Sequence, residues 1–447
     1  MSPLDTEVPA LLLRLDRNPF HHGSLGAVRS LGRAGVEVHA FVERPGTPLG
    51  RSRFLRRAHV FTGDPASAAD VERALLAAAA RIGRPAVLIP MDDVGAVTAA
   101  RLAGRLGGRF LLPALPDGLA ERVADKAELA ALCARSGVPH PTTLMPSSAA
   151  EAAAAVTGLG LPTVAKWSRP WLLPPGGGLR STTLVTSAAQ ARELFRAAPL
   201  AGSRLLLQRL VPGGPGADWF FHGCFGAGGE CLMGGTGRKE LSWPVRAGLT
   251  AVGSGRPSPE IAAVARRLAR HLGFRGVADL DFRRDAATGV HHLLGFNPRP
   301  GAQFRLFTDG SGLDVVRALH LDLTGRPVRP GRPVAGRVFV AENYGPLAAL
   351  AAGGRLPRGT VAAGRREVEW AWFAADDPAP FLAMTGGWLG RGALSLGRRL
   401  AGAAGGAARP GPRSRMPVTS GGHRPHDPGK HQKHETRVSG EATCMTS

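Results

Sequence analysis

Along the first 115 residues, short apolar runs alternate with stretches in which apolar residues recur every three or four positions. The runs at 10–16, 36–41 and 85–90 predict buried strands, and the periodic stretches that follow them predict helices. Strands that alternate with helices favour a parallel sheet wound by right-handed crossovers. We therefore predict an α/β domain with a Rossmann-like parallel sheet over residues 1–115.

Beyond residue 115 the pattern changes to an α+β mixture. A helix that starts near Asp125 ends at Gly137, and two later stretches predict antiparallel hairpins, with Gly-rich or polar turns. These signals predict a second domain over residues 116–330 and a smaller subdomain within it at about 160–210. Weaker signals predict a small C-terminal extension over 331–400. Residues 401–447 are rich in Gly, Pro and charge, and we expect them to be disordered.

Composition restricts the possible functions. The net charge is +22, but only five of the 56 basic residues are Lys, and the basic residues are spread along the whole chain. An even spread argues against a nucleic-acid-binding patch, although a basic nucleic-acid-associated protein remains an alternative. We find no apolar run long enough for a membrane helix and no secretory signal, and we expect a cytoplasmic protein that binds neither nucleic acid nor membrane.

The rarity of Lys makes its positions informative. Lys126 follows Asp125 at a helix start, Lys166 lies near the end of an apolar strand, and Lys239 follows a hairpin. In an Arg-rich chain, Lys indicates sites that need a compact point charge, as at phosphate groups; chance retention is the alternative. The loop after Lys166 contains three successive glycines whose backbone N–H groups could close over phosphate: Gly176, Gly177 and Gly178.

A second group of polar residues lies on the hairpin near residue 290. The two-residue period of a strand puts Asp279 and Asp281 on one face, and Asn297 and Arg299 lie at the end of the neighbouring strand. Oxygen ligands of this kind suit Mg²⁺ together with phosphates, and Arg299 could hold a transferring phosphoryl group. A salt-bridged hairpin edge is the alternative.

Taken in order, these motifs resemble the ATP-grasp superfamily, most closely its carbamoyl-phosphate-synthase-like branch of carboxylate–amine ligases. The resemblance covers about residues 8–330 and implies a pre-ATP-grasp domain followed by a two-subdomain ATP-grasp fold. It implies that Lys126 and Lys166 contact ATP phosphates beneath a mobile glycine flap.

The same resemblance implies an adenine and ribose site. Gln208 stands where the family usually has Glu or Gln, and the backbone of Arg209, Leu210 and Val211 would hold adenine. Asp218 matches the acid that binds ribose.

For the metal, the resemblance implies that Asp281 and Asn297 bind Mg²⁺ (or Mn²⁺). "GFNPR" resembles the family's Glu-x-Asn-Pro-Arg, but the Glu that bridges two Mg²⁺ ions is replaced by Gly295. Loss of a bidentate carboxylate weakens charge stabilisation at the transferring phosphoryl group.

The activity implied is ADP-forming ligation of a small carboxylate to an amine (or a thiol) through an acyl phosphate. Arg299, Lys239 and Arg238 are the candidate catalytic residues, and Arg305 is a further candidate for holding the carboxylate. The resemblance is also compatible with a homodimer. The main alternative is a degenerate ATP-grasp protein that binds nucleotide without efficient turnover, because Gly295 lacks the carboxylate.

Overall fold

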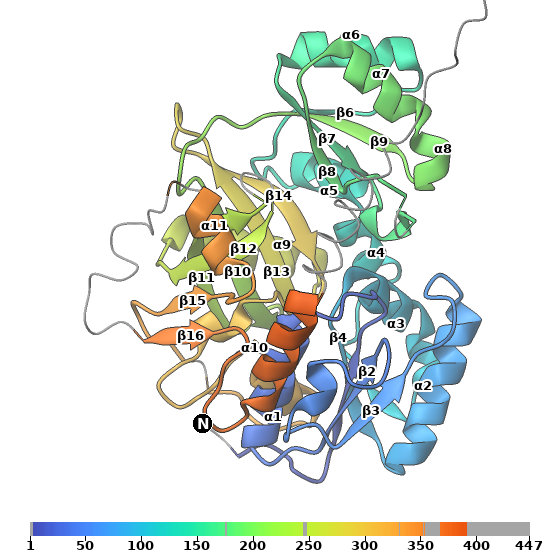
Figure 1. Cartoon of the computed structure of the whole chain (residues 1–447), viewed down its shortest axis with the longest axis vertical. Helices are drawn as coiled ribbons and strands as arrows, with labels where there is room; N and C mark the ends of the chain where they lie inside the picture. Colours follow the sequence, from blue (N-terminus) through green and yellow to red (C-terminus); the bar gives the residue numbers. More distant parts are fainter. Residues whose placement is uncertain are drawn as a thin grey trace, which may run out of the picture. The chain divides into compact units, whose positions relative to one another are not determined.

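The computed structural model describes residues 3–174, 177–244, 248–329, 331–351, 353 and 367–390, which form three sheets with flanking helices (Figure 1). This mixture of strands and helices, with a parallel sheet at its N-terminal end, confirms the predicted fold class. The tail predicted over residues 401–447 lies outside the described residues.

The first sheet has five parallel strands in the order β3-β2-β1-β4-β5. The elements are β1 (Ala10–Leu13), α1 (His22–Arg33), β2 (Val38–Val42), η1 (Leu49–Arg51), β3 (Arg57–Val60), α2 (Ala68–Ile82), β4 (Ala86–Pro90), α3 (Asp93–Leu106) and β5 (Phe110–Leu111). Strands β1 and β2 are buried throughout, which explains their unbroken apolar runs. The sequence pattern misses β3, an edge strand in which only His59 is buried.

The second sheet has seven strands in the order β14-β13-β10-β11-β12-β15-β16. Neighbouring strands are antiparallel except β15 and β16. Its strands are β10 (Asp218–Phe225), β11 (Cys231–Trp243), β12 (Leu249–Gly255), β13 (Gly276–Arg284), β14 (His291–Asn297), β15 (Val338–Val340) and β16 (Val368–Trp370). Strand β12 is missed by the sequence pattern, because its glycines and serine interrupt the apolar alternation.

Helices cover both faces of this sheet, because alternate residues of each strand point to opposite sides. Phe221 and Phe225 of β10 pack in one apolar cluster with α9, whereas Phe220 and Cys224 pack in another with α10. The helices associated with this sheet are α4 (Leu119–Ala124), α5 (Lys126–Arg135), α9 (Pro259–Leu272), η3 (Phe304–Phe307), α10 (Val315–Leu323) and α11 (Gly345–Ala351).

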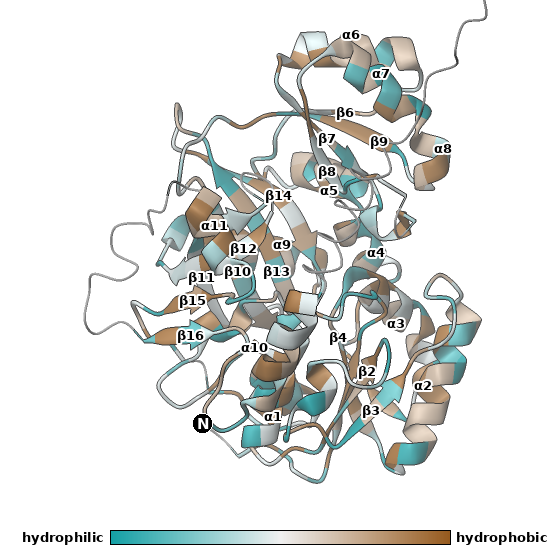
Figure 2. Ribbon diagram, in the orientation of Figure 1, coloured by the Kyte–Doolittle hydropathy of each residue, from teal (hydrophilic) through white to brown (hydrophobic). Residues whose placement is uncertain are grey.

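The third sheet is small and antiparallel, with the order β6-β9-β7-β8. Its elements are β6 (Thr143–Leu144), α6 (Ala149–Leu159), β7 (Thr163–Trp167), η2 (Pro170–Leu172), β8 (Thr182–Val185), α7 (Ala188–Arg196), α8 (Ala198–Ala201) and β9 (Leu205–Arg209). Trp167, Leu205 and Leu207 belong to its apolar core, and the hydrophobic character of β9 is visible in Figure 2.

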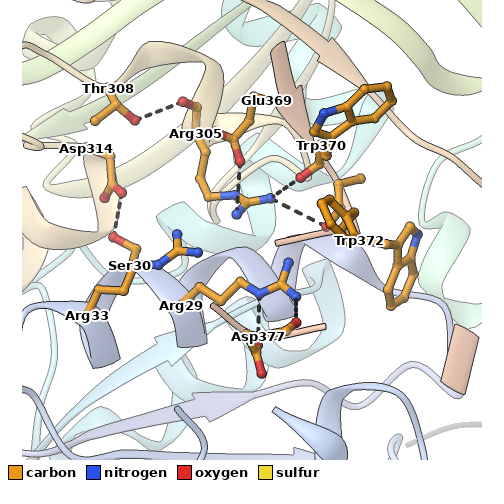
Figure 3. A network of polar contacts seen from close by, with 12 residues as sticks. Arg29, Ser30, Arg33, Arg305, Thr308, Asp314, Glu369, Trp370, Trp372 and Asp377 are labelled. Carbon is orange, nitrogen blue, oxygen red and sulfur yellow. Dashed lines mark hydrogen bonds and ion pairs between the residues drawn. The ribbon is translucent and has the colours of Figure 1, made fainter. Parts of the chain in front are cut away.

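The segment over 367–390 joins the second sheet to the first. It begins as β16, continues to Asp377 and ends in a helix over 379–390. Asp377 accepts a hydrogen bond from Arg29 Nε of α1 at 2.9 Å (Figure 3). It also accepts one from Ser52 Oγ at 2.7 Å, and Trp372 packs against His22. We call residues 367–377 the C-terminal strap.

None of the helices in the described part of the chain combines the length and apolar character that a membrane span requires.

Candidate functional site

The candidate site lies on the face of the second sheet where β13 and β14 pair. Asp279 stands opposite Asn297 and Asp281 stands opposite Gly295 in the antiparallel register. Because side chains alternate along a strand, these two rows point to the same side of the sheet. The register therefore brings together the predicted metal-binding residues Asp281 and Asn297, with position 295 beside them.

Lys126 reaches this face from the start of α5. Asp125 caps the helix, since its carboxylate accepts from the backbone N–H groups of Ala127 and Glu128. The same carboxylate is bonded by Ser168 Oγ and, at 2.9 Å, by Arg169 Nε. The backbone N–H of Lys126 donates to the Ser168 carbonyl at 2.8 Å. The helix start is thus attached to the end of β7.

The Lys126 ammonium lies directly beside Gly295. A Cβ atom placed on Gly295 would be 3.3 Å from Lys126 Nζ and 3.6 Å from Asp281 Oδ2. One ammonium group and one carboxylate therefore face the same point above the β13–β14 pair.

Lys166 approaches the same point from β7. Its ammonium donates to the Leu294 carbonyl at 3.3 Å, next to Gly295. Burial, and then the charge of Lys126, lower the pKa of Lys166 to about 8, while Asp281 opposes the shift. Neither Lys126 nor Lys166 forms an ion pair with any carboxylate of the described residues. Residues far apart in sequence thus form a positively charged site with two unpaired ammonium groups.

The glycine loop connects β7 to β8. Gly177 and Gly178 are described, and Gly178 has a left-handed φ of +74°, whereas Gly176 lies outside the described residues. Trp167 Nε1 donates to the Arg180 carbonyl at 3.1 Å and ties the end of the loop to β7. The loop therefore starts and ends close to the strand that carries Lys166.

The segment after β9 holds the residues predicted to contact adenine and ribose. Gln208 is buried, and its amide donates to Thr143 Oγ1 at 2.9 Å. Arg209 ends β9, and Leu210 and Val211 follow it. The Val211 carbonyl accepts from Arg283 Nε at 2.9 Å.

Arg283 also binds Gly213 and Asp218. It donates to the Gly213 carbonyl at 3.1 Å and pairs with Asp218 Oδ1 at 2.7 Å. The sequence argument missed Arg283, although it lies two residues beyond Asp281 and so on the same face of β13. This spacing is the signal that could have identified it.

Arg299 lies between two carboxylates. Its guanidinium pairs with Asp93 at 3.1 Å and with Asp279 at 3.0 Å. Burial alone would lower the pKa of Arg299, but these two carboxylates outweigh it and raise the pKa. Asn297 Nδ2 donates to the Asp279 carboxylate at 3.3 Å, so Asp279 is already bonded on this side. Asp93, which begins α3, was also missed by the sequence argument.

His222 lies against the buried side of Asp279. Its Nε2 is 3.7 Å from Asp279 Oδ1, and neither atom has a hydrogen-bond partner among the described residues. Burial raises the pKa of Asp279 and lowers that of His222. The ring also lies where a side chain at Gly301 would have to be, which requires glycine at that position.

The remaining candidates lie elsewhere. On β11, Arg238 forms a bidentate ion pair with Glu240, and Lys239 donates to the Gly248 carbonyl at 3.3 Å. Arg305 is buried, pairs with Glu369 at 3.0 Å and donates to the Trp370 carbonyl (Figure 3). The expectation that Arg305 holds a substrate carboxylate is wrong, because its side chain is only 8% exposed and the C-terminal strap occupies its guanidinium, whereas the Arg238 side chain is 31% exposed.

A divalent cation finds few ligands here. Among the described residues, no group of three or more His, Cys, Asp or Glu side chains is arranged to hold a metal. Asp281 and the Asn297 side-chain oxygen remain as donors, and a nucleotide would have to supply phosphate oxygens. This donor set fits Mg²⁺, which is bound through one or two carboxylates, substrate phosphates and water.

No protein-family model matches the sequence, and a search of curated proteins finds no match. Solved structures do resemble the chain. N5-carboxyaminoimidazole ribonucleotide synthetase from Thermus thermophilus is 19% identical with a TM-score of 0.53, and the match covers 73% of this chain and 81% of that one.

The biotin carboxylase domain of 2-oxoglutarate carboxylase from Hydrogenobacter thermophilus, in complex with MgADP and bicarbonate, is 17% identical. Its TM-score is 0.54, and 72% of this chain and 71% of that chain are covered. L-amino acid ligase from Bacillus licheniformis is 14% identical with a TM-score of 0.52, over 73% and 74% of the two chains. At these identities the likeness shows the fold alone, and this fold is the ATP-grasp fold that the sequence predicted.

Proposed function

We propose that this protein binds Mg-ATP on the β13–β14 face and ligates a small carboxylate to an amine, or to a thiol, with release of ADP. The single observation that carries the proposal is the convergence of Lys126, Lys166 and Asp281 around Gly295. Two unpaired ammonium groups beside one carboxylate suit a triphosphate with a divalent cation. Neighbours of the same fold include an MgADP complex and an amino acid ligase.

The proposed nucleotide site has three parts. Lys126, Lys166 and the loop from Gly176 to Gly178 hold the phosphates, Gln208 to Val211 hold adenine, and Asp218 holds ribose. Asp281 and Asn297 bind Mg²⁺, which when bound neutralises phosphate charge. The domain limits proposed from the sequence are 1–115, 116–330 with a subdomain at 160–210, and 331–400.

The reaction proceeds in two steps. A carboxylate oxygen of the acid attacks the γ-phosphorus of ATP, the bond to the β-γ bridging oxygen breaks, and ADP leaves. The amine nitrogen then attacks the carbonyl carbon of the acyl phosphate, inorganic phosphate leaves, and the nitrogen loses a proton. The protein positions the reactants and neutralises charge, without a covalent intermediate of its own.

Three cations are proposed to hold the substrate during these steps. Arg299 is fixed between Asp93 and Asp279 and lies beside Asn297, so its position is rigidly determined. Arg238 and Lys239 on β11 are proposed to bind the carboxylate or the acyl phosphate.

The test is ADP release from ATP and Mg²⁺ after addition of a mixed pool of amino acids, measured against the same mixture without acceptor. We expect release that depends on both Mg²⁺ and acceptor. No ADP above background with any acceptor would contradict the ligase.

The second candidate is a protein that binds nucleotide without efficient turnover, and Gly295 is the observation that favours it. Gly295→Glu adds a carboxylate opposite Asp281, so we expect it to raise Mg²⁺ affinity in the presence of ADP. Gly295→Ala is the matched control, because it adds only a methyl group. An unchanged affinity in Gly295→Glu would count against the assignment of this site.

A further inference from the structure

The fold does not require glycine at position 295. Gly295 lies within the paired region of β14, and it is not among the glycines with a left-handed backbone. An extended backbone accepts any residue, so conformation does not explain the absence of a side chain.

Crowding by backbone atoms does not explain the absence of a side chain at position 295 either. The nearest atoms to a Cβ at position 295 are Lys126 Nζ and Asp281 Oδ2, which are the ends of side chains. The next atom, Asp281 Cβ, is 3.9 Å away. What a larger side chain would displace is the ammonium group of Lys126.

The ammonium is held there by the attachment of α5. Lys126 follows a cap whose carboxylate is buried and bonded by four groups, from Ala127, Glu128, Ser168 and Arg169. Its backbone N–H is bonded to the Ser168 carbonyl. The base of the side chain is therefore fixed, and its positive charge is delivered beside Asp281.

The carboxylates around this point suffice for one ion. Asp281 is free of hydrogen bonds to the other described side chains, whereas Asp279 is bonded by Arg299 and Asn297. One carboxylate and one amide oxygen, together with phosphate oxygens, make a site for a single divalent cation. A second cation would lack a carboxylate and would face the two ammonium groups of Lys126 and Lys166.

We infer that the nucleotide is bound with one divalent cation, and that the Lys126 ammonium, which Gly295 leaves room for, supplies the charge that a second cation would otherwise provide. This inference rests on the proposed nucleotide site. It assigns to Gly295 a role in making space for a fixed cation, so that the glycine is part of a working site.

Counting bound Mn²⁺ tests the inference without any turnover. The full chain is saturated with a non-hydrolysable ATP analogue and titrated with Mn²⁺, and free Mn²⁺ is followed by electron paramagnetic resonance. We expect one Mn²⁺ per chain that depends on the analogue. Two analogue-dependent ions per chain would overturn the inference and leave the nucleotide site intact, whereas failure of the analogue to bind at all would overturn both.

Lys126→Gln provides a second readout. Removing the ammonium should weaken binding of the analogue roughly tenfold or more at low Mn²⁺, since a charged hydrogen bond is lost. High Mn²⁺ should restore part of that loss, because the metal then carries more of the charge neutralisation. Unchanged affinity at all Mn²⁺ concentrations would overturn the inference.

Arg135→Gln is the control, because Arg135 is an exposed cation at the other end of α5. We expect it to bind the analogue as the wild type does. Circular dichroism establishes that each variant is folded.

Discussion

Charged side chains are paired in one region of this protein and lack a carboxylate partner in another. Asp377 of the C-terminal strap and Arg29 of α1 form an ion pair in which both side chains are almost wholly buried. At the β13–β14 face, Lys126 and Lys166 are held near Asp281 without an ion pair among the described residues. Desolvated charges are costly unless they are paired. The first group therefore stabilises the fold, and the lack of a carboxylate partner in the second supports the proposal that it binds an anionic ligand.

The largest expected effect is the loss of stability when the ion pair between the C-terminal strap and α1 is broken. Asp377→Ala leaves the buried Arg29 guanidinium without its carboxylate, and we expect the free energy of unfolding to fall by about 3–5 kcal/mol. Chemical denaturation measures this change. The neighbouring pair Arg33–Asp376 is partly exposed. Asp376→Ala should therefore cost about 1 kcal/mol or less. Equal effects of the two variants would contradict the distinction.

Lys166→Met, in contrast to Asp377→Ala, should reduce nucleotide binding and leave stability intact. We expect nucleotide affinity to fall roughly tenfold to a hundredfold, since a charged group that would meet phosphate is lost. Stability should stay the same or rise, because a half-buried cation with no carboxylate partner is removed. Calorimetric titration with ADP and thermal unfolding measure the two quantities. A variant that is unstable yet binds ADP normally would show that Lys166 is structural.

The pKa of Lys166 predicts that the affinity for ADP depends on pH, because the same ammonium charge is lost when the group is deprotonated. With a pKa of about 8 in the free protein, the ammonium is charged below that pH and neutral above it. Affinity for ADP should therefore be highest below about pH 8 and fall as the pH rises further. Fluorescence titration between pH 7 and 9.5 measures it. Lys166→Met should flatten the profile, and an unflattened profile would assign the dependence to another group.

The smallest expected effect is the loss of ADP affinity when Arg283 is replaced. Because it bonds the Val211 carbonyl and Asp218 together, Arg283→Gln should weaken ADP binding about fivefold, the loss of a typical hydrogen bond. Asp218→Asn should weaken it similarly, and the double variant should lose less than the sum of both. Additive losses would show that Arg283 does not act through Asp218. Comparison of ATP with its 2′-deoxy form provides a second readout.

The sequence predicted those features of the fold and of the candidate site that depend on local patterns of residues. The two-residue period placed Asp279 and Asp281 on one face, and the rarity of Lys pointed to Lys126 and Lys166. The apolar runs of β1, β2 and β4 identified the parallel sheet, because strands buried on both faces have few polar residues.

What the sequence missed depends on contacts between distant segments. Asp93 and Arg299 are 206 residues apart, and only the folded chain brings them together. Arg305 was a candidate for holding the carboxylate by analogy with the family alone. The strap that occupies it begins more than 60 residues later and carries no periodic signal that would identify its partner.

The most direct test of the contrast between paired and unpaired charges is calorimetric titration of the wild-type protein and Lys166→Met with a non-hydrolysable ATP analogue and Mg²⁺. We predict one analogue bound per wild-type chain and a loss of affinity in the variant, whose stability is retained. No binding to the wild type, or equal binding to both proteins, would contradict the proposal that these ammonium groups form a nucleotide site.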